Sequence, residues 1–113
     1  MVSPEDFQKI ALGFPEVEEL PHFEKTSFRV KKKIFATLDL TNLEATVKLS
    51  FTEQDIFSLG RAEVIYPVPN KWGKQGWTRV ILKKVDKALL QTVLISAYCE
   101  VAPARLSKGI TRP

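Results

Sequence analysis

The sequence is poor in the residues from which most catalytic and transition-metal sites are built. Cys99 is its only cysteine and His22 its only histidine. No intrachain disulfide can form, and a Ser–His–Asp or Cys–His set could be assembled only around His22. One histidine and one cysteine do not make a transition-metal site. We therefore expect no catalytic residues, metal or cofactor, with Cys99 buried as a small hydrophobe and His22 at the surface or in packing.

Long apolar runs are also missing. No uninterrupted apolar run approaches the roughly 20 residues that a membrane helix needs. The N-terminal residues MVSPEDFQKI contain two acids and no apolar segment, unlike a secretory signal peptide. There is no glycine-rich phosphate loop and no dinucleotide-binding fingerprint. These absences favour a cytoplasmic protein that is neither a membrane protein nor a nucleotide-dependent enzyme.

What is present fits one compact unit. A chain of 113 residues can bury a core without disulfides or metal, so we expect a single domain, residues 1–113, and a monomer. Ser3, Pro4 and the acids after them predict a helix start, and Gly13 followed by Pro15 predicts its end. An acidic loop, PEVEELP, is expected next.

Strand-like runs follow at residues 22–30, 33–39 and 44–51. We then expect a short helix capped by Thr52, a short edge strand in residues 62–69, and a strand in residues 77–84. Asp86 predicts the start of the longest helix, and Pro103 predicts either its end or a kink. Its apolar stripe is Leu90, Val93, Leu94, Ala97, Tyr98 and Val101.

Antiparallel strands between terminal helices predict an α+β fold, a two-layer sandwich. Alternation along the strands separates a core face from an open face, provided that no strand carries a bulge. The predicted core face is Phe28, Val30, Ile34, Ala36, Leu38, Ala45, Val47, Leu49, Val80 and Leu82. The predicted open face is Lys25, Ser27, Arg29, Phe35, Thr37, Asp39, Thr46, Lys48, Ser50, Arg79, Ile81 and Lys83, with five bases and one acid.

Charge is distributed unevenly along the chain. Residues 1–24 hold six acids and one base, a net charge of −5, whereas residues 25–113 carry a net charge of +9. This asymmetry indicates either a polyanionic partner or an unevenly solvated surface.

The stretch from Tyr66 to Lys87 interleaves cations with large rings. Trp72 and Trp77 lie five residues apart, among Lys71, Lys74, Arg79, Lys83 and Lys84. Cations can meet phosphates while rings stack on bases, as a polyanion-binding surface requires. The same composition also suits an ordinary turn whose aromatics cap a core.

Several short motifs, in this order and spacing, resemble the MmcQ/YjbR family over nearly the whole chain. They are Phe14-Pro15, Lys33-Ile34-Phe35-Ala36, Val47-Lys48-Leu49, Tyr66-Pro67, Asn70-Lys71-Trp72, Gly76-Trp77 with Val80, and Ser96-Ala97-Tyr98. The resemblance implies a cyaY-like α+β sandwich related in shape to frataxin, and a DNA-binding label that rests on fold analogy. The Trp-Gly pair that the family usually carries after its first helix is replaced here by Glu18-Glu19-Leu20-Pro21-His22.

The implied frataxin-like shape also suggests the hypothesis that the protein binds metal ions. The only acidic cluster is Glu5, Asp6, Glu16, Glu18 and Glu19. These acids are typical of a solvated loop and a helix N-terminus, so we expect no metal site.

Two functional hypotheses remain open. The first is a non-enzymatic module that binds DNA or another polyanion through the basic open face and the loop around Trp72 and Trp77, here called the tryptophan loop. Its predicted site is Lys25, Arg29, Lys48, Lys71, Trp72, Lys74, Trp77, Arg79 and Lys83. The second is a small-ligand or protein-binding domain in which Arg79 and Lys48 hold an anionic group beside Phe35 and Trp77.

Overall fold

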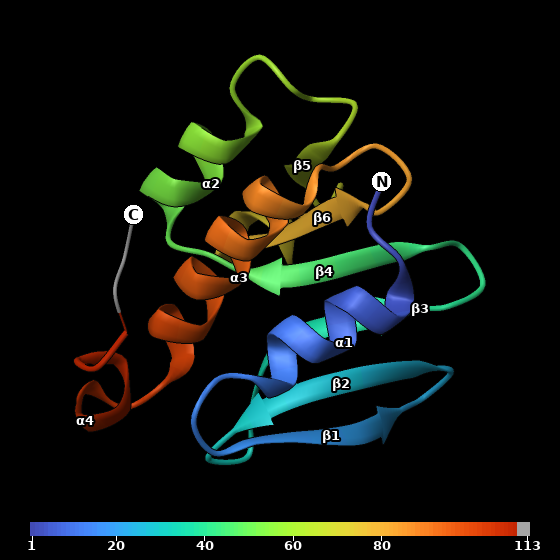
Figure 1. Cartoon of the computed structure of the whole chain (residues 1–113). Coiled ribbons are helices and arrows are strands. Elements are labelled where there is room, and N and C mark those ends of the chain that lie inside the picture. The colour runs from blue at the N-terminus through green and yellow to red at the C-terminus, as the bar shows by residue number, and fades with distance from the viewer. Residues whose placement is uncertain (111–113) are drawn as a thin grey trace.

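The computed structural model describes residues 1–110 and has two layers, with helices packed on one face of a six-stranded sheet (Figure 1). Its strand order is β1-β2-β3-β4-β6-β5, and every neighbouring pair is antiparallel. The elements are α1 (Pro4–Leu12), β1 (Val17–His22), β2 (Lys25–Val30), β3 (Lys33–Asp39), β4 (Glu44–Lys48), α2 (Phe51–Ser58), β5 (Ile65–Pro67), a 3₁₀ turn (Gly73–Gln75), β6 (Trp77–Ile81), α3 (Lys87–Val101) and α4 (Ala104–Ser107). The predicted α+β sandwich is confirmed. Within residues 1–110, no helix has the length and apolarity to cross a membrane.

The terminal helices begin where their capping residues predict. The Ser3 hydroxyl accepts a hydrogen bond from the Asp6 amide at 3.1 Å, and Pro4 occupies the first turn. The Asp86 carboxylate accepts one from the Leu89 amide at 2.7 Å. Each cap satisfies an amide that the first turn of a helix leaves without a partner.

The core lies between α3 and the inner face of the sheet. The α3 stripe is buried from Leu90 to Tyr98, and Val101 is half-buried. Every member of the predicted core face is buried except Ile34. Cys99, which we expected to be buried, is half-buried against this core.

A bulge in β3 reverses two predicted positions. Phe28 pairs with Ala36 and Arg29 with Ile34, which leaves Phe35 as an extra residue in β3. Phe35 is fully buried, with its ring centroid 6.2 Å from that of Phe14 and 5.6 Å from that of Tyr98. The assignments of Phe35 to the open face and Ile34 to the core were therefore wrong.

Three other boundaries differ from those predicted. The expected acidic loop is mostly β1, an edge strand paired with β2; its largely exposed side chains show no alternation. The helix α2 is capped by Ser50, whose hydroxyl accepts from the Glu53 amide at 3.1 Å, and not by Thr52. The last predicted strand ends at Ile81, so Lys83 lies in the turn that follows.

The helices leave the second face of the sheet, the open face, uncovered in the part of the chain described (Figure 1). Across this face, Ser27, Thr37, Thr46 and Arg79 lie in one row, because each is paired with the next through the strand register. Of this row, Thr37, Thr46 and Arg79 are partly accessible, whereas Ser27 is buried and donates its hydroxyl to the Leu20 carbonyl.

Candidate functional site

A cleft with a volume of about 360 Å³ crosses the open face. Thr37, Thr46 and Arg79 form its floor, because they are neighbours in the strand register. Residues from both edges of the sheet contribute to its walls. The lining residues are His22, Lys25, Ile34, Thr37, Thr46, Val68, Asn70, Trp72, Trp77 and Arg79. The cleft therefore combines aromatic and aliphatic surface with the basic side chains of Lys25 and Arg79 and several hydrogen-bonding groups.

The loop between β5 and β6 supplies one wall and is firmly held. The Val68 amide donates to the Trp77 carbonyl at 3.0 Å, and the Trp72 amide donates to the Asn70 side-chain oxygen at 2.8 Å. Beneath the loop, the buried amide of Gln54 donates to the Gly73 carbonyl at 3.0 Å. These bonds fix the backbone that carries Trp72.

Two glycines make this close docking possible. A Cβ atom on Gly73 would lie 2.0 Å from the Val68 carbonyl oxygen, and one on Gly76 would lie 2.0 Å from the Leu49 carbonyl oxygen. Gly76 also has a φ of +101°, a backbone conformation that residues with a side chain rarely adopt. Glycine is therefore required at positions 73 and 76 for the loop to pack closely against its neighbours.

The two tryptophans have different environments. Trp72 is 50% exposed, and the ammonium of Lys71 lies 5.8 Å from its ring centroid, within cation–π range. Trp77 is half-buried in the cleft wall. Trp72 therefore does not cap the core, and its ring remains available for stacking.

Arg79 is the cation on the cleft floor. Its Nε lies 3.3 Å from Oε2 of Glu44, and both side chains are about one quarter exposed. The contact is an ion pair only. Its geometry does not meet that of a hydrogen bond, and within residues 1–110 the buried Nε has no other hydrogen-bond acceptor. Glu44 shares the open face with Thr46 two residues on, so strand alternation could have identified this acid. The predicted balance of five bases and one acid was therefore wrong, and the face is less basic than expected.

The structure brings together only part of the predicted site. Four of its nine residues line the cleft: Lys25, Trp72, Trp77 and Arg79. Lys71 and Lys74 line a separate depression on the same loop. Lys48 instead donates to the Gln75 carbonyl, and Arg29 Nε donates to the Ser27 hydroxyl at 2.9 Å. Arg29, Lys48 and Lys83 do not line the cleft.

Several lining residues were not predicted as part of the site. His22 has no sequence signal, because its place in the cleft depends on the position of the β1–β2 edge in the folded sheet. Val68 and Asn70 line the cleft because they belong to the loop between β5 and β6. Ile34 lines it because the bulge in β3 turns its side chain to the open face. Ile34 therefore provides the apolar surface that the small-ligand hypothesis attributed to Phe35.

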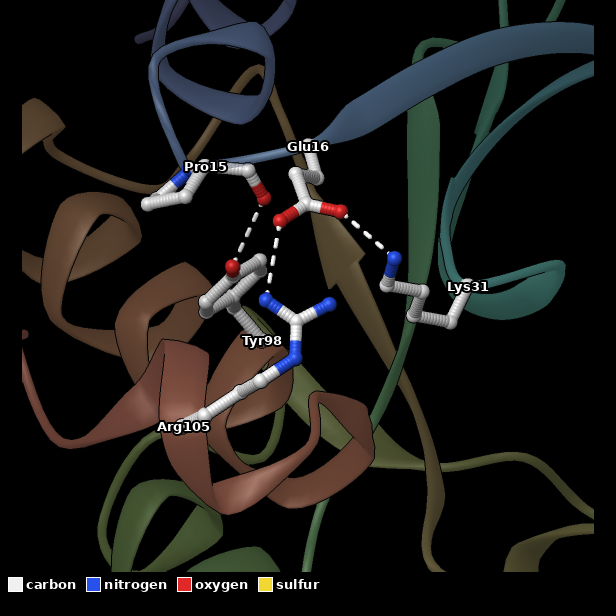
Figure 2. Close-up of polar contacts among 5 residues, drawn as sticks. All are labelled: Pro15, Glu16, Lys31, Tyr98 and Arg105. Carbon is white, nitrogen blue, oxygen red and sulfur yellow. Dashed lines mark hydrogen bonds and ion pairs between the residues drawn. The ribbon is translucent and has the colours of Figure 1, made fainter.

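The acidic N-terminal part of the chain makes internal contacts, shown in Figure 2. Glu16 forms ion pairs with Lys31 at 2.7 Å and with Arg105 at 3.2 Å, and these two contacts hold the pKa of Glu16 below its ordinary value. The Tyr98 hydroxyl donates to the Pro15 carbonyl at 2.7 Å. Within residues 1–110, no group of three histidine, cysteine or acidic residues is arranged to hold a metal ion.

Comparison with known proteins gives a family and a fold. Residues 12–100 match the family model described as YjbR. The crystal structure of Deinococcus radiodurans protein DR2400, whose domain is described as DUF419, is similar, with a TM-score of 0.81 and 22% sequence identity. The match covers 100% of this chain and 91% of that chain, and at this identity it shows the fold alone. No curated protein matches the sequence.

Proposed function

This chain belongs to the YjbR family, and we propose that it is a non-enzymatic module that binds nucleic acid as a single strand. One observation carries the proposal: the open cleft sets the rings of Trp72 and Trp77 beside the cations Arg79 and Lys25. Exposed rings stack on bases of any sequence, and cations neutralise the backbone phosphates. We include in the proposal that the protein acts in the cytoplasm as a monomer.

Two features favour a single strand over a duplex. In a duplex the faces of the bases are stacked on one another, so the half-exposed ring of Trp72 would have no base face to meet. Glu44 also neutralises part of the charge of Arg79, which reduces the positive surface that a wide duplex backbone would contact. A narrow chain with unstacked bases fits this mixture of rings and few cations better.

Intrinsic fluorescence tests this proposal directly. Trp72 and Trp77 are the only tryptophans, and both line the cleft. Titration with oligothymidylate at about 50 mM salt should change their emission and saturate, whereas a duplex of the same length should bind more weakly. Absence of saturable binding to single-stranded DNA or RNA in these conditions would overturn the proposal.

A small anionic ligand is a second candidate. The cleft volume of about 360 Å³ lies within the range of small-molecule sites, roughly 300–1,000 Å³. The Arg79 side chain lines the cleft and is about one quarter exposed, and its guanidinium is a donor group suited to a carboxylate or phosphate. A thermal-shift series with mononucleotides and aromatic carboxylates separates the two functions. A ligand that saturates the protein while oligonucleotides do not would favour this second candidate.

A further inference from the structure

Phe23, at the tip of the β1–β2 hairpin, combines two features that do not stabilise a fold. Its side chain is 94% exposed, and its backbone has a φ of +58°. The two-residue turn connects His22 and Lys25, which are paired in the register. Positive φ in such turns is typical of glycine, asparagine or aspartate, and a bulky residue there is strained. Packing within residues 1–110 therefore gives no reason for a phenylalanine at this position.

The position of the tip relative to the cleft suggests a use for this ring. His22 and Lys25, on either side of the tip, both line the cleft. The rings of His22 and Phe23 are in edge-to-face contact, with centroids 4.9 Å apart. Phe23 itself does not line the cleft, but its ring lies against that of His22, which does.

Trp72 occupies the corresponding position at the other side of the sheet. It projects from the loop after β5, and β1 and β5 are the two edge strands. Five strand spacings separate these edges along the sheet, a path of about 24 Å at roughly 4.8 Å per spacing, whereas across the open face His22 and Trp72 line the same cleft. Between the two exposed rings lie the cations Lys25 and Arg79.

We propose that Phe23 is a second stacking platform, and that a single-stranded nucleic acid crosses the open face from the Trp72 loop to the β1–β2 tip. This inference rests on the proposed function and adds the path of the strand. The bases at the two ends stack on Trp72 and Phe23, and the phosphates between them meet Arg79 and Lys25. Glu24 is exposed at the same tip, so the positive charge at this end comes from Lys25 alone.

The path predicts that the contribution of Phe23 depends on ligand length. The experiment uses oligothymidylates of about 2, 4, 8 and 12 nucleotides, which span the usual site sizes of single-strand-binding folds. Trp72→Ala should weaken binding at every length. Phe23→Ala should leave the affinity for the shortest oligomer unchanged and reduce that for the longest by about 5-fold or more, the lower limit for loss of one stacked base.

Two further variants separate binding from structure. Phe23→Gly should raise the melting temperature, because glycine accepts the positive φ, while lowering affinity for the long oligomers. A structural role for the ring would instead lower the melting temperature. The matched control is Phe51→Ala, since Phe51 is 63% exposed but belongs to α2, on the helix side of the sheet, and should not change affinity at any length.

The outcomes distinguish this inference from the proposed function. If the wild-type protein binds the long oligomers and both Phe23 variants bind them equally well, the path to the hairpin tip is wrong and the function stands. If the wild-type protein binds no oligomer of any length, the proposed function is wrong and the path falls with it.

Discussion

At the scale of single residues, Trp72 and Tyr98 show two uses of an aromatic ring. The Trp72 ring is half exposed above the cleft, with Lys71 beside it. Tyr98 is buried, packs its ring against Phe14 with centroids 4.8 Å apart, and uses its hydroxyl to satisfy the Pro15 carbonyl. Only the first ring leaves a face open for a ligand.

Replacing Trp72 with alanine should therefore affect binding more than folding. We expect Trp72→Ala to change the free energy of unfolding by less than about 1 kcal/mol, because most surface substitutions have small effects. The same variant should lose about 1–3 kcal/mol of affinity for single-stranded oligonucleotides. Chemical denaturation and fluorescence anisotropy with a labelled oligonucleotide measure the two effects. A large loss of stability with unchanged affinity would show that the ring has a structural role.

At the scale of elements, two kinds of contact join parts that are distant in the sequence. The helix α3 packs its apolar stripe against β3 and β4 and forms the centre of the core. Glu16, before β1, joins the β2–β3 turn through Lys31 and α4 through Arg105 (Figure 2). The packing of α3 on the sheet excludes water. The ion pairs of Glu16 are exposed to solvent, and they require that its carboxyl group be ionised.

The core contact predicts a large effect of truncation in α3. Leu94 is fully buried. Leu94→Ala should cost roughly 2–5 kcal/mol of unfolding free energy, because it removes transfer free energy and leaves a cavity. Urea denaturation measures this loss. A change below about 0.5 kcal/mol would mean that Leu94 is outside the core.

The exposed contact predicts a dependence on pH. Lys31 and Arg105 lower the pKa of Glu16 in the folded protein from an ordinary value of 4.5. The stabilisation from this carboxylate is therefore present above that value and is lost as the pH falls through the lower, folded-state pKa. Urea denaturation of Glu16→Gln and wild type should show a difference at pH 7 that shrinks below about pH 4.5. A difference that stays constant across this range would contradict the ion-pair role.

At the scale of the whole molecule, charge and shape act together. The acidic N-terminal segment carries α1 and β1, and part of its charge is paired internally through Glu16. The remaining residues carry the positive excess, and Lys71 and Lys74 lie together on the tryptophan loop. If phosphates bind beside this loop, affinity must fall as salt rises, because each neutralised phosphate releases counterions.

The salt dependence can be assigned to the loop with a matched pair of variants. About four phosphate contacts should give a log–log slope of roughly −3 for a single strand. Replacing Lys71 and Lys74 with alanine should flatten this slope by about 1.4, without unfolding the protein. Replacing Lys83 and Lys84 with alanine removes the same charge in the turn after β6, away from the tryptophan loop, and should leave the slope unchanged. Equal flattening by both pairs would indicate attraction by net charge alone.

The sequence by itself determined the features that depend on local patterns. Ser3 and Asp86 predicted the starts of two helices because a cap involves only the residues of one turn. The stripe from Leu90 to Tyr98 and most of the core face followed from helical and strand periodicity. The tryptophan loop was identified from its composition, and the lysines of the loop lie together because they are neighbours in the chain.

Only the tertiary structure decided the features that depend on which strands pair and how. The bulge that places Phe35 in the core and Ile34 in the cleft exists only in the pairing of β3 with β2. The meeting of Glu44 with Arg79, and of His22 with Trp72 in one cleft, joins segments far apart in the sequence. Local propensity contains no information about such partners, because register and sheet curvature come from contacts between strands. For that reason the sequence predicted which cations share the open face. Which of them line the cleft could be seen only in the folded sheet.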